Sequence, residues 1–205
     1  MVEKLVKLIQ QKDQLTEQLG QPKSYLQNVK LQRMKTEKQR AMSQLYQMYV
    51  EELSSVCYRY VPSSDDAKDV LQNSFVKIFT SLPTFEYRDE SSFRNWMSKV
   101  VVNEALHLLR ERKRLRFTNL KESLVDYVED EQPLVEHITA DQLHQLISQL
   151  PDGYRTVINL YVFEGYSHQK IAEMLNITAS TSASQLYFAK RLLSRKINEF
   201  INKRQ

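Results

Sequence analysis

A group of aromatic side chains near the middle of the chain alternates with cationic ones around a short polar segment. The aromatic members are Phe85, Tyr87, Phe93 and Trp96, and the cations nearest to them are Arg88, Arg94, Lys99 and Arg110. Aromatic rings stack on unpaired bases and cations neutralise phosphates, so this mixture is typical of a surface that binds single-stranded nucleic acid. The helical phase of Phe93 and Trp96 also fits a hydrophobic core, which we favour for these two. Tyr87 and Arg88 fall in the polar segment, where a functional role is favoured.

A second group of candidate binding residues lies on the last predicted helix. Residues 167–175 and 178–200 predict a short and a longer helix, with a tight turn at Asn176-Ile177-Thr178. In such a helix-turn-helix the second helix enters the major groove of duplex DNA. We expect its polar side chains to reach DNA, and Gln185 to read adenine if it faces the groove. The candidates are Ser180, Thr181, Ser182, Ser184, Gln185, Tyr187, Lys190 and Arg191. A helical pair that serves protein contacts is the alternative.

The charges are distributed unevenly around a modest net charge of +4. Residues 107–121 are basic, residues 122–141 are acidic, and the stretch from Thr178 onward is basic again. Two basic blocks on either side of an acidic one indicate two contacts with a polyanion, joined by a segment that avoids duplex phosphates. Solvated helix faces are the alternative explanation for each basic block taken alone.

The sequence holds no arrangement of residues that indicates an enzyme. Its four histidines are scattered, and it contains no HExxH pair, no P-loop and no GxGxxG segment. Asp65, Asp66 and Asp69 could suggest metal ligands. They lie at a predicted helix start, however, where carboxylates more simply stabilise the exposed backbone N–H groups and the helix dipole. The single cysteine, Cys57, excludes an internal disulfide and a cysteine-based metal site. We therefore predict a protein that is not an enzyme and that uses no cofactor or metal.

The spacing of apolar residues predicts an all-α fold with two small helical domains. Three glycines and five prolines in 205 residues leave few places for hairpins. Three-and-four spacing predicts one helical domain over residues 41–115, an acidic connector over 116–138, and a second domain over 139–205 that contains the helix-turn-helix. In the second domain we expect a helix that opens at Pro151 and ends near Gly165, with these side chains packed inside: Tyr154, Val157, Ile158, Tyr161 and Val162.

Residues 1–40 form an N-terminal extension with a weaker pattern. Val2, Leu5, Ile9 and Leu19 recur at roughly heptad spacing, but polar residues interrupt the seam and residues 20–22 end it. We expect a helical or flexible arm of little independent stability, whose removal up to residue 35 leaves the fold stable. No window approaches the roughly 20 apolar residues of a bilayer span, and no signal peptide is evident, so a cytoplasmic protein without membrane insertion is predicted.

Two long segments of the chain resemble the extracytoplasmic-function group of sigma-70 family RNA polymerase sigma factors. Residues 45–82, with "DDAKDVLQNSF", and residues 91–114, with "FRNWM" and "VVNEA", are similar to the domain that binds polymerase and melts the promoter. Residues 150–186 are similar to the second, promoter-binding domain of this group, and "GYRTVINLYVFEGYSH" is close to members from the Bacteroidetes. The resemblance covers roughly residues 41–200.

The resemblance implies a partner or a DNA element for each candidate site. Residues on the clamp helices of core RNA polymerase would bind Asp66, Asp69, Gln72 and Phe75. The melted −10 element and the duplex just upstream of it would contact a set of residues from the aromatic group to the basic run. These are Phe85, Tyr87, Arg88, Ser92, Arg94, Trp96, Asn103, Arg110, Arg112, Lys113 and Arg114. The acidic connector would thread through the polymerase, and the helix from Thr178 to Arg195 would read the −35 element. An anti-sigma factor is a possible further partner.

Two positions depart from the pattern of this group and keep other functions open. Many relatives carry cations where this chain has Ala183 and Phe188, and a loss of charge there should lower phosphate affinity. A sigma-like adaptor that binds polymerase without promoter recognition is therefore one alternative. An ordinary helix-turn-helix regulator that binds duplex DNA alone is the other, and it has no need of the first domain.

Overall fold

The computed structural model describes residues 1–19, 25–112 and 138–203, and every regular element in these ranges is a helix. The all-α prediction is therefore confirmed for the described part of the chain. Contacts divide the chain into two compact units. Unit 1 comprises Met1–Cys57 and Ser64–Ala105, and unit 2 comprises Tyr58–Ser63 and Leu106–Gln205.

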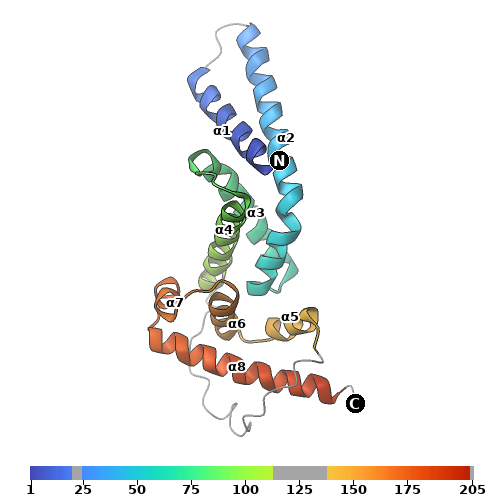
Figure 1. Cartoon of the computed structure of the whole chain (residues 1–205), viewed down its shortest axis with the longest axis vertical. Coiled ribbons are helices and arrows are strands. Elements are labelled where there is room, and N and C mark those ends of the chain that lie inside the picture. The colour runs from blue at the N-terminus through green and yellow to red at the C-terminus, as the bar shows by residue number, and fades with distance from the viewer. Residues whose placement is uncertain (20–24, 113–137, 204–205) are drawn as a thin grey trace. The chain divides into compact units, whose positions relative to one another are not determined.

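Unit 1 is built from four helices and one short turn of 3-10 helix (Figure 1). Their bounds are α1 Val2–Leu19, α2 Tyr25–Tyr60, α3 Ser64–Ser81, η1 Leu82–Thr84 and α4 Glu90–Glu111. Pro62 lies between α2 and α3. Pro83 lies in the first turn of η1, a position that accepts proline because its backbone N–H would have no partner within the helix.

The core of unit 1 forms where the apolar stripes of α2, α3 and α4 meet. Each stripe follows the three-and-four spacing of an amphipathic helix, which turns these side chains to one face. The members less than about a tenth exposed include Leu45, Tyr49 and Leu53 from α2, Val70, Phe75 and Ile78 from α3, and Phe93, Met97 and Val101 from α4. Phe93 meets the ring of Tyr49 edge-on at 5.7 Å, so the two aromatic side chains join α2 to α4.

The N-terminal extension is helical, one of its two predicted states, and it is also a packed part of unit 1. Val2, Val6 and Ile9 of α1 are buried, and α2 is one continuous helix from Tyr25, with Leu31 and Met34 buried on its first half. Lys12 pairs with Glu37 at 2.8 Å across the two helices. The sequence pattern alone suggested a marginal helix, but burial against a neighbouring helix supplies the stability that an isolated helix lacks.

Unit 2 contains the helix-turn-helix and the helices that support it. Its elements are α5 Ala140–Ser148, α6 Asp152–Ile158, the π-helical turn η4 Asn159–Phe163, α7 His168–Leu175 and α8 Ala179–Asn202. Thr139 begins α5 with a capping box, in which Thr139 and Gln142 satisfy each other's backbone N–H groups. Pro151 is the N-cap of α6, which therefore begins at Asp152, one residue later than predicted.

A buried arginine fixes the connection from α5 to α6. Arg155 is 3% exposed, and its guanidinium donates to the carbonyl oxygens of Ser148 at 3.3 Å and Leu150 at 2.7 Å. It also forms an ion pair with Asp152. A buried cation is tolerated only when it is paired and hydrogen-bonded, and these contacts meet that requirement.

The π-helical turn overturns one packing prediction. Tyr161 and Val162 were expected in the core, but they are 39% and 54% exposed. A π-helical turn adds a residue to the helical repeat, so the side chains after Leu160 rotate away from the buried face. Gly165 follows with φ of +69°, the left-handed conformation that glycine adopts without strain, so the predicted glycine stop is confirmed.

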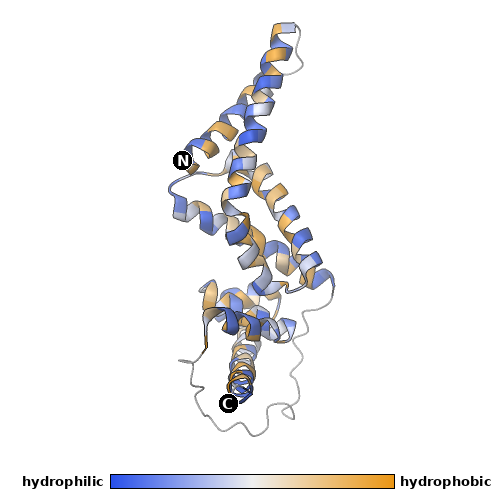
Figure 2. Ribbon diagram, turned by 90° about the vertical axis from the view of Figure 1, so that its right-hand side faces the viewer, coloured by the Kyte–Doolittle hydropathy of each residue, from blue (hydrophilic) through white to orange (hydrophobic). Residues whose placement is uncertain are grey.

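Hydrophobic and hydrophilic residues mix along each helix (Figure 2). In the described ranges, every helix is too short or too polar to span a lipid bilayer.

Candidate nucleic-acid interface

An aromatic cluster forms where η1 leads into the segment before α4. The ring of Phe85 stacks on the indole of Trp96, with centroids 4.4 Å apart, and both side chains are half-buried. Phe93 lies beneath them, fully buried, at 5.5 Å from Phe85 and 5.8 Å from Trp96. The core position favoured for Phe93 is thus found, while Trp96 is only partly covered and keeps a face at the surface.

Tyr87 and Arg88 occupy the polar segment beside this cluster. Tyr87 is half-buried, with its ring 6.0 Å from Phe93, and its pKa is raised by burial and then by the nearby carboxylates, chiefly Glu90. Arg88 is exposed and lies 3.9 Å from Glu86, a weak ion pair between well-solvated groups. An aromatic ring and an exposed cation therefore lie together, as the sequence predicted for this segment.

Ser92 helps to begin α4. The Asp89 carboxylate accepts a hydrogen bond of 2.7 Å from the backbone N–H of Ser92, which lowers the pKa of Asp89. The Ser92 hydroxyl donates to the Asp89 carbonyl at 3.3 Å. Ser92, a predicted DNA contact, therefore takes part in a helix-start arrangement that fixes the polar segment against α4.

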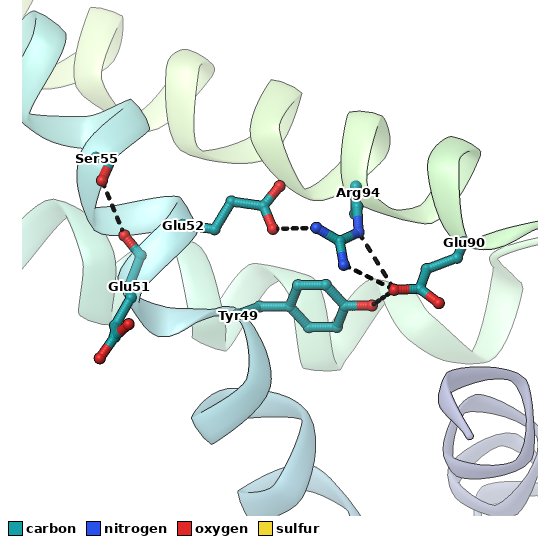
Figure 3. A network of polar contacts seen from close by, with 6 residues as sticks. All are labelled: Tyr49, Glu51, Glu52, Ser55, Glu90 and Arg94. Carbon is teal, nitrogen blue, oxygen red and sulfur yellow. Dashed lines mark hydrogen bonds and ion pairs between the residues drawn. The ribbon is translucent and has the colours of Figure 1, made fainter. Parts of the chain in front are cut away.

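Arg94, another predicted DNA contact, is held by two carboxylates and a ring (Figure 3). Its guanidinium donates to Glu52 at 2.6 Å and to Glu90 at 2.8 Å, and it lies 5.3 Å from the centre of the Tyr49 ring. The hydrogen bond from Arg94 lowers the pKa of Glu90, and burial with Glu90 nearby raises that of Tyr49 to about 12. The side chain of Arg94 is 45% exposed, so a phosphate can still approach its outer edge.

Several predicted contacts share one face of α4. Trp96, Asn103 and Arg110 are spaced seven residues apart, which places them one above another after two helical turns. Asn103 and Arg110 are exposed, and so is Arg112 just beyond the helix. Lys113 and Arg114 lie outside the described residues. The face runs from an aromatic end to a cationic end, which suits a nucleic-acid strand that passes from stacked bases to phosphates.

The four predicted polymerase contacts on α3 separate into an exposed and a buried pair. Asp69 and Gln72 are exposed, whereas Asp66 is 7% and Phe75 is 5% exposed. The helical phase of α3 explains the difference in exposure. Phe75 lies on the apolar stripe, and the centre of its ring is 4.6 Å from that of Tyr46. Asp66 and Phe75 can therefore support a docking surface from within, and Asp69 and Gln72 can form it.

The helix-turn-helix has the turn that the sequence predicted. Asn176 adopts the left-handed conformation, with φ of 54°, and ends α7. The Thr178 hydroxyl then accepts a hydrogen bond of 3.0 Å from the backbone N–H of Thr181 and caps α8. Asparagine tolerates the left-handed region and threonine is a good N-cap, so both features follow from local chemistry.

The face of α8 differs from its prediction at two residues. Ser182 and Gln185 were candidate DNA contacts, but they are 0% and 1% exposed. They share a stripe with Leu186 and Ala189 that packs on unit 2, and the Ser182 hydroxyl lies 3.0 Å from Nδ1 of His168. Neither reaches a DNA groove in this structure, because the phase of the helix directs them inward.

The remaining candidates on α8 lie at or near the surface. Ser180, Tyr187 and Lys190 are exposed, together with Ala183, while the following three are half-buried: Thr181, Ser184 and Arg191. Arg191 donates to the Tyr187 hydroxyl at 3.3 Å and lies over its ring. The first three turns of α8 therefore present hydroxyls and an aromatic ring, and the first cation on this helix is Lys190.

The residues that the sequence reading missed belong to α1 and α2. Gln10 of α1 donates hydrogen bonds to the turn before the aromatic cluster, and Glu52 and Tyr49 of α2 hold Arg94. Apolar spacing at Val2, Val6 and Ile9 could have indicated that α1 packs, but nothing local indicates the partners of Gln10. Within the described ranges, no group of three histidine, cysteine or acidic residues is placed to hold a metal ion.

Comparison with known proteins assigns a family to both parts of the chain. Residues 45–115 match the model of Sigma-70 region 2, and residues 140–193 match that of Sigma-70, region 4. The ECF RNA polymerase sigma-E factor of Haemophilus influenzae is 29% identical over 184 residues, covering 82% of this chain and 93% of that protein. The RNA polymerase sigma factor SigV of Bacillus subtilis is 28% identical over 138 residues, covering 67% of this chain and 80% of that protein.

A solved structure with a weaker likeness is the sigma factor RpoE in complex with the anti-sigma factor NepR from Bartonella quintana. It is 19% identical, with a TM-score of 0.45 over 75% of this chain and 94% of that chain.

The two matched regions together span more than half of the chain, follow the order expected of region 2 and region 4, and contain the aromatic cluster and the helix-turn-helix described above. The chain therefore belongs to the sigma-70 family and is an RNA polymerase sigma factor of the extracytoplasmic-function type.

Proposed function

We propose that this protein binds core RNA polymerase and directs promoter recognition, DNA melting and transcription initiation through the residues described above. The observation that carries the proposal is the presence, in one chain, of a region 2 with an aromatic cluster at its surface and a region 4 with a capped helix-turn-helix. The proposed domains are an extension at 1–40, region 2 at 41–115, a linker at 116–138 and region 4 at 139–205.

The aromatic cluster is proposed to capture the melted −10 element. Extruding a base from duplex DNA costs a few kcal/mol, so a site that stacks the base has to offset this cost. The outer faces of Trp96 and Tyr87 offer rings for stacking, and Arg88 offers a charge for the phosphate. Asn103, two turns along α4 from Trp96, adds an exposed amide for hydrogen bonds to a base edge.

Upstream duplex DNA is proposed to continue along the cationic end of α4. Arg110 and Arg112 are exposed there, and the chain adds Lys113 and Arg114 next in sequence. Contacts of this kind position DNA without reading its sequence. Arg94 is proposed to act at the edge of this surface, while its ion pairs with Glu52 and Glu90 keep it in place.

The polymerase is proposed to dock on the exposed side of α3. Asp69 and Gln72 lie there, and the buried Asp66 and Phe75 support them. A polar docking surface backed by an aromatic core residue keeps its geometry in the free protein, which reduces the entropy lost on binding. The acidic linker is proposed to pass through the polymerase between the two DNA-binding regions.

Region 4 is proposed to read the −35 element with the exposed face of α8. Ser180, Ala183, Tyr187 and Lys190 form this face, with Thr181, Ser184 and Arg191 at its sides. Because the first turns carry no charge, sequence reading would depend on hydroxyl and aromatic contacts more than on phosphate attraction.

Three further proposals concern the setting of the protein. It is proposed to act in the cytoplasm, where core polymerase resides, and to accept an anti-sigma factor as a regulatory partner. The sequence of residues 153–168 is the basis for a proposed relationship to the Bacteroidetes members of the group.

Run-off transcription tests the proposed function. Core RNA polymerase from a related bacterium is incubated with a pool of genomic promoter fragments, with and without the protein. Defined new transcripts that require the protein are expected, and their start sites give the −10 and −35 preferences. Tight, sequence-specific binding of duplex promoter by the protein alone, with no effect on polymerase, would instead support a helix-turn-helix regulator.

The uncharged start of α8 favours one second candidate, a sigma-like adaptor that binds polymerase but does not select promoters. Ala183 is exposed where a cation would meet phosphate, and Ser182 and Gln185 are buried. An adaptor would co-purify with polymerase and compete with other sigma factors, yet it would support no transcript from any fragment in the pool.

A further inference from the structure

The side chain of Gln10 joins α1 to the turn that precedes the aromatic cluster. Its Nε2 donates to the carbonyl oxygen of Leu82 at 2.9 Å and to that of Phe85 at 2.7 Å. An amide nitrogen carries two hydrogens, so both of its donors are used. The two acceptors are the first residue of η1 and the residue that follows η1, and Phe85 N–H itself donates to Leu82 at 3.2 Å. Gln10 therefore closes the turn from outside.

The position of Gln10 is fixed by contacts on either side of it in α1. Val2, Val6 and Ile9 are at most 3% exposed, and they attach the first half of the helix to the core of unit 1. Lys12 pairs with Glu37, and Asp13 accepts from Lys38, which attach the next turn to α2. Figure 1 shows α1 beside α2, and the N-terminal part of α1 lies near the turn where α3 passes into α4. Such a support holds a side chain in one place with little loss of entropy on forming its bonds.

The first turn of α1 also reaches the polar segment after the turn. The carboxylate of Glu3 contributes, after burial and Glu90, to raising the pKa of Tyr87. Gln10 thus holds the turn through hydrogen bonds, and Glu3 lies close enough to Tyr87 for its charge to act there.

We infer that Gln10 is a positioning residue for promoter opening: it holds the turn Leu82–Phe85 so that Phe85 stays stacked on Trp96 and the base-capturing surface is formed before DNA binds. The inference rests on the proposed role of this surface in melting the −10 element. It gives the N-terminal extension a function in region 2. A preformed surface lowers the barrier to capture, because the loop need not be ordered at that step.

The test uses four variants of the full chain, one of which, Phe85→Ala, removes the ring that stacks on Trp96. Gln10→Met keeps the length of the side chain and removes both donors. Gln10→Lys keeps a donor group at a similar reach and serves as the rescue variant. Gln11→Met makes the same chemical change at the next position of α1, which is exposed, and serves as the matched control.

Two measurements are made on each variant. In the free protein, acrylamide quenching of Trp96, the only tryptophan of the chain, reports whether Phe85 still covers the indole. With core polymerase, opening of a duplex promoter is followed by permanganate reactivity of unpaired thymines and compared with initiation from a premelted template. The premelted template removes the opening step and leaves polymerase binding and catalysis unchanged.

For Gln10→Met we expect stronger quenching of Trp96 and opening of duplex promoter slowed roughly tenfold, as two lost hydrogen bonds would produce. Initiation from the premelted template should stay near wild type, and so should Gln10→Lys and Gln11→Met in both measurements. Wild-type quenching and opening in Gln10→Met, while Phe85→Ala impairs both, would overturn the positioning role and leave the proposed function standing. If Gln10→Met and Phe85→Ala both showed stronger quenching of Trp96 but opened the duplex promoter at the wild-type rate, the cluster would have no role in melting. That result would overturn this inference too. An equal loss on both templates would overturn the inference in favour of a general folding role.

Discussion

The ring of Phe85 stacks on the indole of Trp96 with centroids 4.4 Å apart and an angle of 30° between the planes. Phe85 ends the turn that follows α3, and Trp96 lies on the second turn of α4, so this contact joins the two helices through the segment between them. Because Phe93 supports both rings from below, the pair has a fixed inner side and a partly open outer side.

Replacing Tyr87 should separate stacking from hydrogen bonding in the proposed base site. Base stacking on an aromatic side chain is worth about 1–3 kcal/mol, so Tyr87→Ala should slow promoter opening roughly tenfold or more. Tyr87→Phe keeps the ring and should open promoters close to the wild-type rate. The measurement is permanganate footprinting with core polymerase, alongside polymerase affinity. An equal loss of opening and of polymerase affinity would assign Tyr87 a structural role.

The two pairs of residues on α3 should behave differently when replaced. Asp69→Ala with Gln72→Ala should weaken core polymerase binding without a change in melting temperature, because both side chains are exposed. Phe75→Ala should lower the free energy of unfolding by about 3–5 kcal/mol, because it leaves a cavity in the core. Asn73→Ala, also exposed on α3, is the matched control and should change neither quantity. Normal polymerase affinity in the Asp69 and Gln72 variant would move the docking surface away from this side of α3.

Adding a charge to the start of α8 should strengthen its attraction to DNA. Ala183→Lys places a cation on an exposed position of the first turns, where it can meet a phosphate. The slope of log affinity against log salt for a promoter complex should steepen by about one. The check is a salt titration of polymerase complexes formed with each protein. Glu199→Lys, which makes a larger charge change on an exposed position near the end of α8, is the control. Equal steepening in both would mean that general charge, and not a contact of α8 with DNA, causes the effect.

Removing a buried side chain from α1 should destabilise unit 1. Ile9 is fully buried, so Ile9→Ala should lower the free energy of unfolding by about 2–5 kcal/mol. Lys4→Ala, at an exposed position of the same helix, should leave it within about 0.5 kcal/mol. Denaturant titration followed by circular dichroism measures both. A stable Ile9→Ala variant would restore the earlier expectation that residues 1–35 are dispensable for folding.

The buried thiol should react slowly and should make stability depend on alkaline pH. Burial raises the pKa of Cys57 to about 12, so at pH 8 its thiolate fraction and its alkylation rate should be on the order of a thousandfold lower than in denaturant. The native chain keeps this proton where the unfolded chain, with a pKa near 9, has released it. Stability is therefore complete below about pH 9 and falls as pH rises toward 12. Cys57→Ala should flatten part of that fall, and the remainder should follow Tyr49, Tyr60 and Tyr166, because burial raises the pKa of each of these phenols as well.

Features with local causes could be read from the sequence, and those with distant causes could not. The left-handed turn at Asn176 and the cap at Thr178 were predicted because each depends on one side chain and its own backbone. The π-helical turn at residues 159–163 was not, because it shifts the helical phase by a residue without a change in composition, and it exposed Tyr161 and Val162.

The same distinction explains the outcome at the candidate site. Polarity suggested Ser182 and Gln185 as DNA contacts, but the direction of a polar side chain depends on how α8 packs on the rest of unit 2. The acceptors of Gln10 are 72 and 75 residues away along the chain, so no local pattern could indicate them. The aromatic cluster was predicted as a group, since its members are close in sequence, while the stacking partners within it depend on how η1 packs against α4.

The long helix α2 has a consequence for how far region 2 extends in space. Its 36 residues span roughly 54 Å at the rise of an α-helix. The last part packs in the core from Leu45 onward, and the residues at its start, from Tyr25 to Lys30, are all exposed. A macromolecule that binds this far end is held at a fixed distance from the proposed base-capturing surface, because the helix between them is continuous. Insertion of whole helical turns between residues 25 and 30 would lengthen that spacing and keep the pairs Lys12–Glu37 and Asp13–Lys38 that join α1 to α2.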